Sequence, residues 1–114
     1  MKIKSKRFKE ITLVAKNQPD EQMFLAEYGV PEWIFEEITE DEQEAVKIVT
    51  DIYRVTRLSP KELIAEIGMN QSSFSRRFGI PLRTVQGWCL GEREMPDYIK
   101  YLIAELTGLI IERE

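Results

Sequence analysis

The most restrictive feature of this sequence is a glycine and a proline that separate two short apolar-patterned segments between Gln71 and Leu90. Gly79 follows Phe78, and after a single intervening residue Pro81 begins the second segment. Glycine ends helices because it tolerates the left-handed backbone, and proline suits a first helical position because its missing N–H has no partner there. The chain is therefore predicted to form two short helices, over 71–78 and 81–90, joined by a tight turn.

Helical spacing predicts which side of each segment is buried. Phe74 and Phe78 lie four residues apart and share one face of the first segment. In the second, the inward side is predicted to hold Pro81, Val85 and Trp88, with Leu82 and Cys89 on its flank. The opposite side carries residues too polar or too small for a core: Arg83, Gly87 and Leu90, with Thr84 and Gln86 at its edges. This face is predicted to be open to a ligand.

The remaining sequence predicts an all-α protein, a small helical bundle whose two-helix unit lies toward the C-terminus. Start and stop signals favour two short helices between 20 and 37, a long helix over about 40–57, another from Pro60 to Gly68 and a last one from Pro96. Thr39 and Ser59 are expected to cap the long helix and its successor. Only Ile11–Ala15 is β-prone, and the alternatives there are one short isolated strand or no regular structure.

A chain of 114 residues is expected to hold one modest hydrophobic core. We divide it into an N-terminal basic arm with an acidic helical extension, 1–57, and a C-terminal unit, 58–114, that contains the two short helices. The last helix has little polar circumference, so we expect it to be buried all round, by the N-terminal helices or by a second copy of the chain. A homodimer is the favoured interpretation.

Charge is unevenly distributed along the chain. If the net charge of −4 were spread evenly along the chain, it would argue against binding of nucleic acid. Residues 71–93, however, contain four arginines and one acid, a local charge of +3. Residues 1–9 contain only basic charges, and we weigh a phosphate-binding arm against a solvated terminus: Lys2, Lys4, Lys6, Arg7 and Lys9. Residues 36–44 contain six acids, either a solvated helix start or a docking surface for a basic partner: Glu36, Glu37, Glu40, Asp41, Glu42 and Glu44.

Several classes of chemistry are not expected. The chain has no histidine, and its single cysteine, Cys89, cannot form an internal disulfide. The usual ligands for zinc and the usual catalytic base are therefore missing, and we predict no enzyme activity, no metal and no cofactor. We assign Cys89 no chemistry. No apolar run approaches the roughly 18 residues of a membrane span, so we expect no membrane association and a cytoplasmic location.

Residues 58–108 resemble the phage-repressor-type (XRE) helix-turn-helix family. The resemblance is carried by apolar residues at Phe74, Phe78, Ile80, Val85 and Trp88, by the turn glycine Gly79 and by the small residue Ser75. It implies that Asn70 and Gln71 lie against the DNA backbone, and that Leu82, Arg83, Thr84 and Gly87 reach toward bases. The sequence departs from many relatives at Cys89, where they have an acid, and at Leu90, where they have a polar residue.

These observations predict a sequence-specific regulator of transcription that binds double-stranded DNA, a repressor or autoregulator of bacterial, phage or mobile-element origin. Arginine can pair with guanine and glutamine with adenine in the major groove, so we expect Arg83 and Gln86 to contact bases. Arg76, Arg77 and Arg93 are expected at the DNA backbone.

Two further hypotheses stay open. In one, the chain is an antitoxin or inhibitor whose residues 1–57 bind a protein partner while the helix-turn-helix autoregulates. In the other, the motif is only a fold element of a helical structural protein.

Overall fold

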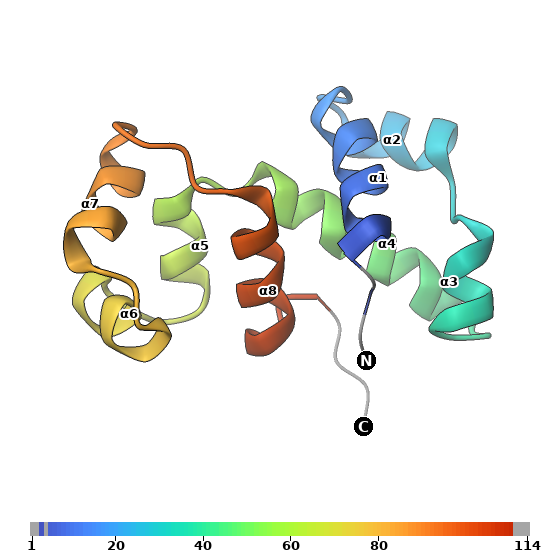
Figure 1. The fold of residues 1–114 in the computed structure, drawn as a ribbon. Helices are drawn as coiled ribbons and strands as arrows, with labels where there is room; N and C mark the ends of the chain where they lie inside the picture. The colour runs from blue at the N-terminus through green and yellow to red at the C-terminus, as the bar shows by residue number, and fades with distance from the viewer. Residues whose placement is uncertain (1–2, 4, 111–114) are drawn as a thin grey trace.

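The computed structural model describes residue 3 and residues 5–110, and all regular structure in this part of the chain is α-helical (Figure 1). The helices are α1 (Ser5–Lys16), α2 (Glu21–Tyr28), α3 (Glu32–Glu37), α4 (Glu42–Arg57), α5 (Pro60–Glu66), α6 (Gln71–Phe78), α7 (Leu82–Leu90) and α8 (Asp97–Thr107). The all-α prediction is confirmed. None of these described helices is long and apolar enough to span a membrane.

Local capping sets most helix starts. The Ser59 side chain accepts a hydrogen bond from the N–H of Glu62, whose carboxylate accepts one from the N–H of Ser59, and Pro60 is at the first position of α5. This start agrees with the sequence prediction. At α4 the carboxylate of Asp41 caps the helix, whereas Thr39 accepts a hydrogen bond from the N–H of Asp41. The cap therefore lies two residues later than predicted.

Both alternatives for Ile11–Ala15, an isolated strand and no regular structure, are wrong, because these residues lie in α1. Ile11, Thr12 and Ala15 are buried while Leu13 is exposed, so burial follows the helical period and not alternation. Within the predicted basic arm, residues 5–9 form the first turns of the same helix. Lys2 and Lys4 lie outside the described residues.

Buried side chains form two clusters, not the single core expected from chain length. The first, the N-terminal cluster, includes Phe8, Ile11, Phe24, Ile34, Ile48, Ile52, Val55, Tyr101 and Ala104. The second, the C-terminal cluster, comprises Leu63, Ile64, Phe74, Val85, Trp88, Met95 and Ile103. Helix α8 contributes to both, since Tyr101 and Ala104 face one cluster and Ile103 the other. This sharing lets a short chain support two clusters.

Polar contacts hold α8 at the junction between the clusters. The Tyr101 hydroxyl hydrogen-bonds the hydroxyls of Thr12 on α1 and Thr56 on α4. The buried ammonium group of Lys100 donates to the carbonyl oxygens of Thr56 (3.3 Å) and Leu58 (2.9 Å), at the C-terminal end of α4. Burial lowers the pKa of Lys100 below its ordinary value. These bonds satisfy carbonyls that the end of α4 leaves without helical partners.

One copy of the chain does not bury the last helix all round, so the alternative in which the N-terminal helices alone cover it is wrong. Tyr98, Leu102 and Leu106 are 65%, 55% and 66% exposed. Their spacing of four residues places them on one side of α8, opposite the side that enters the two clusters. Helix α8 therefore carries more apolar side chains than its described neighbours bury.

The two tryptophans allow a test of the shared helix. Trp33 lies in the N-terminal cluster and Trp88 in the C-terminal cluster. Because α8 belongs to both, we expect one cooperative unfolding transition. In Trp33→Phe and in Trp88→Phe, the urea midpoint from fluorescence of the remaining tryptophan should match that from circular dichroism of the same variant. Midpoints separated by more than about 0.5 M urea would show that the clusters unfold independently.

Candidate nucleic-acid interface

The turn between α6 and α7 is fixed by hydrogen bonds around Ser75. Gly79 ends α6 in the left-handed conformation, with φ of 66°, and its N–H donates to the Ser75 carbonyl. The N–H of Ile80 donates to the same carbonyl at 3.1 Å, and the Ser75 hydroxyl donates back to the Ile80 carbonyl at 2.6 Å. Pro81 is the N-cap of α7 rather than its first residue. The predicted tight turn is confirmed, with α7 beginning one residue later.

The inner faces of α6 and α7 pack as the spacing predicts at Phe74, Val85 and Trp88, whereas Pro81, also expected inward, is exposed. Phe74, Val85 and Trp88 are buried in the C-terminal cluster together with Leu63 of α5. The rings of Phe74 and Phe78 lie 4.9 Å apart, in tilted contact. The start of α6 is held by the Asn70 side chain, which accepts a hydrogen bond from the N–H of Ser73 at 2.8 Å. Helix α7 is therefore supported from behind by rigid packing.

The outer face of α7 carries most of the predicted base-reading residues. Leu82, Arg83, Gln86 and Leu90 are exposed, and Thr84 is half-buried. No hydrogen bond or ion pair joins the side chain of Arg83 or Gln86 to another described residue. Their donors and acceptors are available to an external ligand.

Gly87 departs from the prediction of an open position. It is buried, because the side chain of Arg93 crosses it, and a Cβ atom built on Gly87 would lie 3.3 Å from Arg93 Cδ. The Gly87 carbonyl also accepts hydrogen bonds from the N–H groups of Glu92 and Arg93, at 2.9 and 3.2 Å. The missing Cβ thus lets the Arg93 side chain lie across the helix. Periodicity within α7 alone could not reveal this contact.

Further basic side chains are exposed on α6 and just after α7. Arg76 and Arg77 are exposed in the last turn of α6, and Arg93 is exposed over Gly87. The Arg77 guanidinium lies 5.5 Å from the centroid of the Phe78 ring. None of these arginines forms an ion pair with a residue that the structure describes. The predicted local positive charge is therefore not neutralised within this part of the chain.

The basic residues of α1 are arranged differently. The Arg7 guanidinium pairs with the carboxylates of Glu37 (3.0 Å) and Glu10 (3.8 Å) and lies 5.6 Å from the Trp33 ring centroid. Lys16 forms an ion pair with Asp97 at 2.8 Å. Helix α1 lies on the far side of α8 from α7 (Figure 1). The structure therefore does not bring these basic residues together with Arg83.

Cys89 is half-buried beside the C-terminal cluster. Burial raises the pKa of its thiol above the ordinary value, which reduces the reactive thiolate fraction at neutral pH. Among the described residues, no group of three or more acidic, cysteine or histidine side chains is placed to hold a metal ion.

Comparison with known proteins gave no match to a protein-family model, to a curated protein or to a solved structure. The likeness to the helix-turn-helix family stays a prediction from the motif.

Gly87→Ala tests the role assigned to this glycine. The added methyl meets only an exposed, flexible arginine side chain, and alanine favours a helix by roughly 1 kcal/mol. We expect the free energy of unfolding in urea to be unchanged or raised by up to about 1 kcal/mol. The control, Gly79→Ala, places alanine at φ of 66° and should lower that free energy by about 1 kcal/mol. Equal losses in both variants would contradict this account.

Proposed function

We propose that the protein is a sequence-specific regulator of transcription, a repressor or autoregulator, that inserts α7 into the major groove of double-stranded DNA. The observation that carries the proposal is the outer face of α7. It presents Arg83 and Gln86 without described partners, on a helix fixed from behind by Val85 and Trp88. The major groove, about 12 Å wide, admits such a helix.

The side chains on this face match the chemistry of base edges. Arg83 would donate two hydrogen bonds to O6 and N7 of a guanine, and Gln86 would pair with N6 and N7 of an adenine. Thr84 and Leu82 offer methyl groups to the C5 methyl of thymine. Gly87 is covered by Arg93, so we assign it no base contact and give it the role of placing that arginine.

Phosphate contacts would come from the surrounding arginines and from the start of α6. Arg76, Arg77 and Arg93 are exposed and would neutralise phosphates on either side of α7. The N–H groups at Gln71 lie at the positive end of the α6 dipole and favour a phosphate. Screening confines such attraction to about 8 Å at physiological salt, so the local charge of this face counts for more than the net charge of −4.

We also propose that two copies bind DNA together. Helix α7 has nine residues, and a single recognition helix contacts only a few successive base pairs. A symmetric pair would double the number of contacted bases on a palindromic site.

Selection of bound sequences from a random DNA pool, followed by affinity measurement, tests the proposal. Arg83→Ala should weaken binding to the selected sequence by about 5- to 150-fold, the equivalent of 1–3 kcal/mol, and should weaken binding to random DNA much less. Arg54→Ala removes an exposed arginine of α4 and is the charge-matched control, expected to change affinity less than about twofold. Equal binding of selected and random DNA by the unmodified protein would overturn the proposal.

Salt dependence separates the phosphate contacts from the base contacts. Arg76→Ala should weaken binding to all sequences about equally and lower the slope of log affinity against log salt by about 1. The same titration with Arg83→Ala should show its loss mainly on the selected sequence. A sequence-dependent loss for Arg76→Ala would contradict the division of roles.

A second candidate function is an antitoxin or inhibitor that binds a basic protein through its N-terminal half. It is favoured by the exposed acids of α3 and α4, which lie beside the partly exposed apolar residues Phe35 and Val46. Deletion of residues 1–57 would be a poor test, because it removes the packing of Tyr101 and Ala104. The double variant Glu36→Lys/Glu40→Lys leaves that packing intact and should abolish co-purification with the product of an adjacent reading frame. If the unmodified protein retains no such product, this candidate fails.

A further inference from the structure

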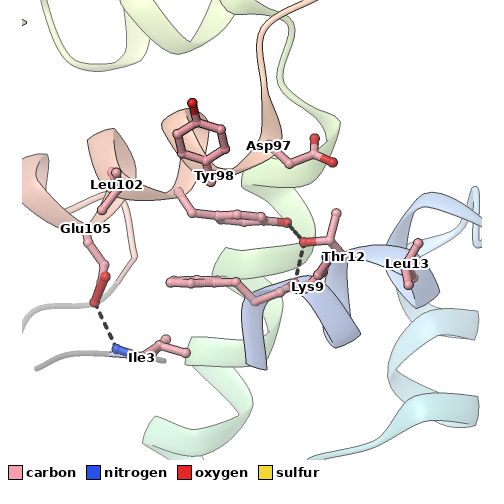
Figure 2. Close-up of a pocket in the computed structure, with 10 residues that line it drawn as sticks. Ile3, Lys9, Thr12, Leu13, Asp97, Tyr98, Leu102 and Glu105 are labelled. Carbon is pink, nitrogen blue, oxygen red and sulfur yellow. Dashed lines mark hydrogen bonds between the residues drawn. The ribbon is translucent and has the colours of Figure 1, made fainter. Parts of the chain in front are cut away.

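Helices α1 and α8 enclose a hollow at the surface, of about 540 Å³ (Figure 2). Its floor includes the stacked rings of Phe8 and Tyr101, whose centroids are 4.4 Å apart. Tyr98 and Leu102 of α8 line one edge, and Lys9 and Leu13 of α1 line the other. This surface lies apart from the outer face of α7, because none of the residues assigned to DNA lines it.

Four of the six polar side chains that line the hollow have partners, and the other two, Lys9 and Tyr98, lie at its edges. Thr12 donates to the Phe8 carbonyl and bonds the Tyr101 hydroxyl. The Asp97 carboxylate pairs with Lys16, and the Glu105 carboxylate accepts a hydrogen bond from the N–H of Ile3 at 3.1 Å. A site for a small molecule needs a few polar groups directed at the ligand to fix its orientation. The hollow instead offers an apolar surface, which suits an apolar side chain of a protein.

Large apolar side chains stand beside the hollow. Leu13 on the α1 edge is 63% exposed, and Tyr98, Leu102 and Leu106 are exposed along α8. Together they expose on the order of 400 Å² of apolar surface, which is comparable with the largest apolar patch of a typical monomer, a patch that is often functional. A stable interface buries about 800 Å² per partner. These four residues would supply about half of that area, and the surrounding polar residues would supply the remainder.

We propose that this surface binds the same surface of a second copy of the chain about a two-fold axis. The face holds both the protruding leucines and the hollow that would receive them, as a self-complementary contact requires. The two edges also differ in charge, with Lys9 on the α1 edge and Glu105 on the α8 edge, whereas Asp97 is already paired with Lys16 of α1. A two-fold axis places the basic edge of each copy against the acidic edge of the other.

The proposed dimer forms without DNA. Only the expectation that dimerisation strengthens DNA binding rests on the proposed function. Since α7 keeps its outer face free, both surfaces can be occupied at once. Sedimentation equilibrium without DNA is therefore the primary test. The unmodified protein should sediment at twice the chain mass of 13.4 kDa at micromolar concentrations.

Leu102→Asp should weaken the dimer by at least about tenfold, because it places two carboxylates at the apolar centre of the contact. The position is exposed, so the circular-dichroism spectrum and unfolding midpoint should stay near those of the unmodified protein. Met23→Asp adds the same charge at an exposed position of α2 outside the hollow and should leave the dimer intact. Leu106→Asp provides a second variant if Leu102→Asp fails to fold.

A monomer of the unmodified protein at 100 µM would overturn the proposal. A dimer that survives both leucine substitutions in folded protein would overturn this choice of surface. Loss of self-association with retained binding to single half-sites would support both proposals. If the unmodified protein dimerises but binds no DNA sequence, this result contradicts the proposed function and still supports the dimer contact.

Discussion

Helix α8 has two buried sides, and the rest of the structure depends on their burial in two different clusters. Tyr101 and Ala104 enter the N-terminal cluster, and Ile103 enters the C-terminal one. Without this helix, a half-chain would have to exclude water from its own small cluster, and small cores are marginal. The buried Lys100 and Tyr101 add polar bonds to α1 and to the end of α4, which specify how α8 lies between the clusters.

The candidate DNA interface follows from the rigidity that this arrangement confers. Helix α7 is short, and nine residues alone would not hold a stable helix in water. Phe74, Val85 and Trp88 bind it to the cluster that α8 completes, and the bonds around Ser75 fix its angle to α6. Its polar face can therefore meet DNA without first losing much conformational entropy. The apolar stripe of α8 lies on another surface, so the chain can self-associate and keep α7 accessible.

Much of the fold could be predicted from local signals. Ser59 with Pro60, Asn70, and Gly79 before Pro81 set helix ends through bonds within a few residues, and such bonds are visible in sequence. The secondary structure of Ile11–Ala15 was predicted wrongly because β-branched residues favour strands only weakly. Packing of this segment against α4 and α8 stabilises a helix instead. The exposed stripe of α8 also could not be predicted, because burial depends on how many neighbours the fold brings to a helix.

The same distinction applies to the candidate site. The outward direction of Arg83 and Gln86 follows from helical geometry within α7, and the structure agrees. The burial of Gly87 depends on Arg93, which reaches it only because the chain folds back after α7. The ion pairs of Arg7 with Glu37 and of Lys16 with Asp97 join residues far apart in sequence. Counting charges along the chain could not separate these paired residues from the arginines of α6 and α7, which form no ion pair with a described residue.

The most direct test of the central claim is a map of the DNA contact on the folded protein. Amide resonances of the ¹⁵N-labelled chain would be followed by NMR during titration with a selected DNA duplex. Shifts concentrated in α7 and at the start of α6, with the Arg83 side chain among the strongest, are the predicted result. Shifts concentrated in α1–α3, or no saturable shifts at all, would contradict the claim that α7 reads DNA.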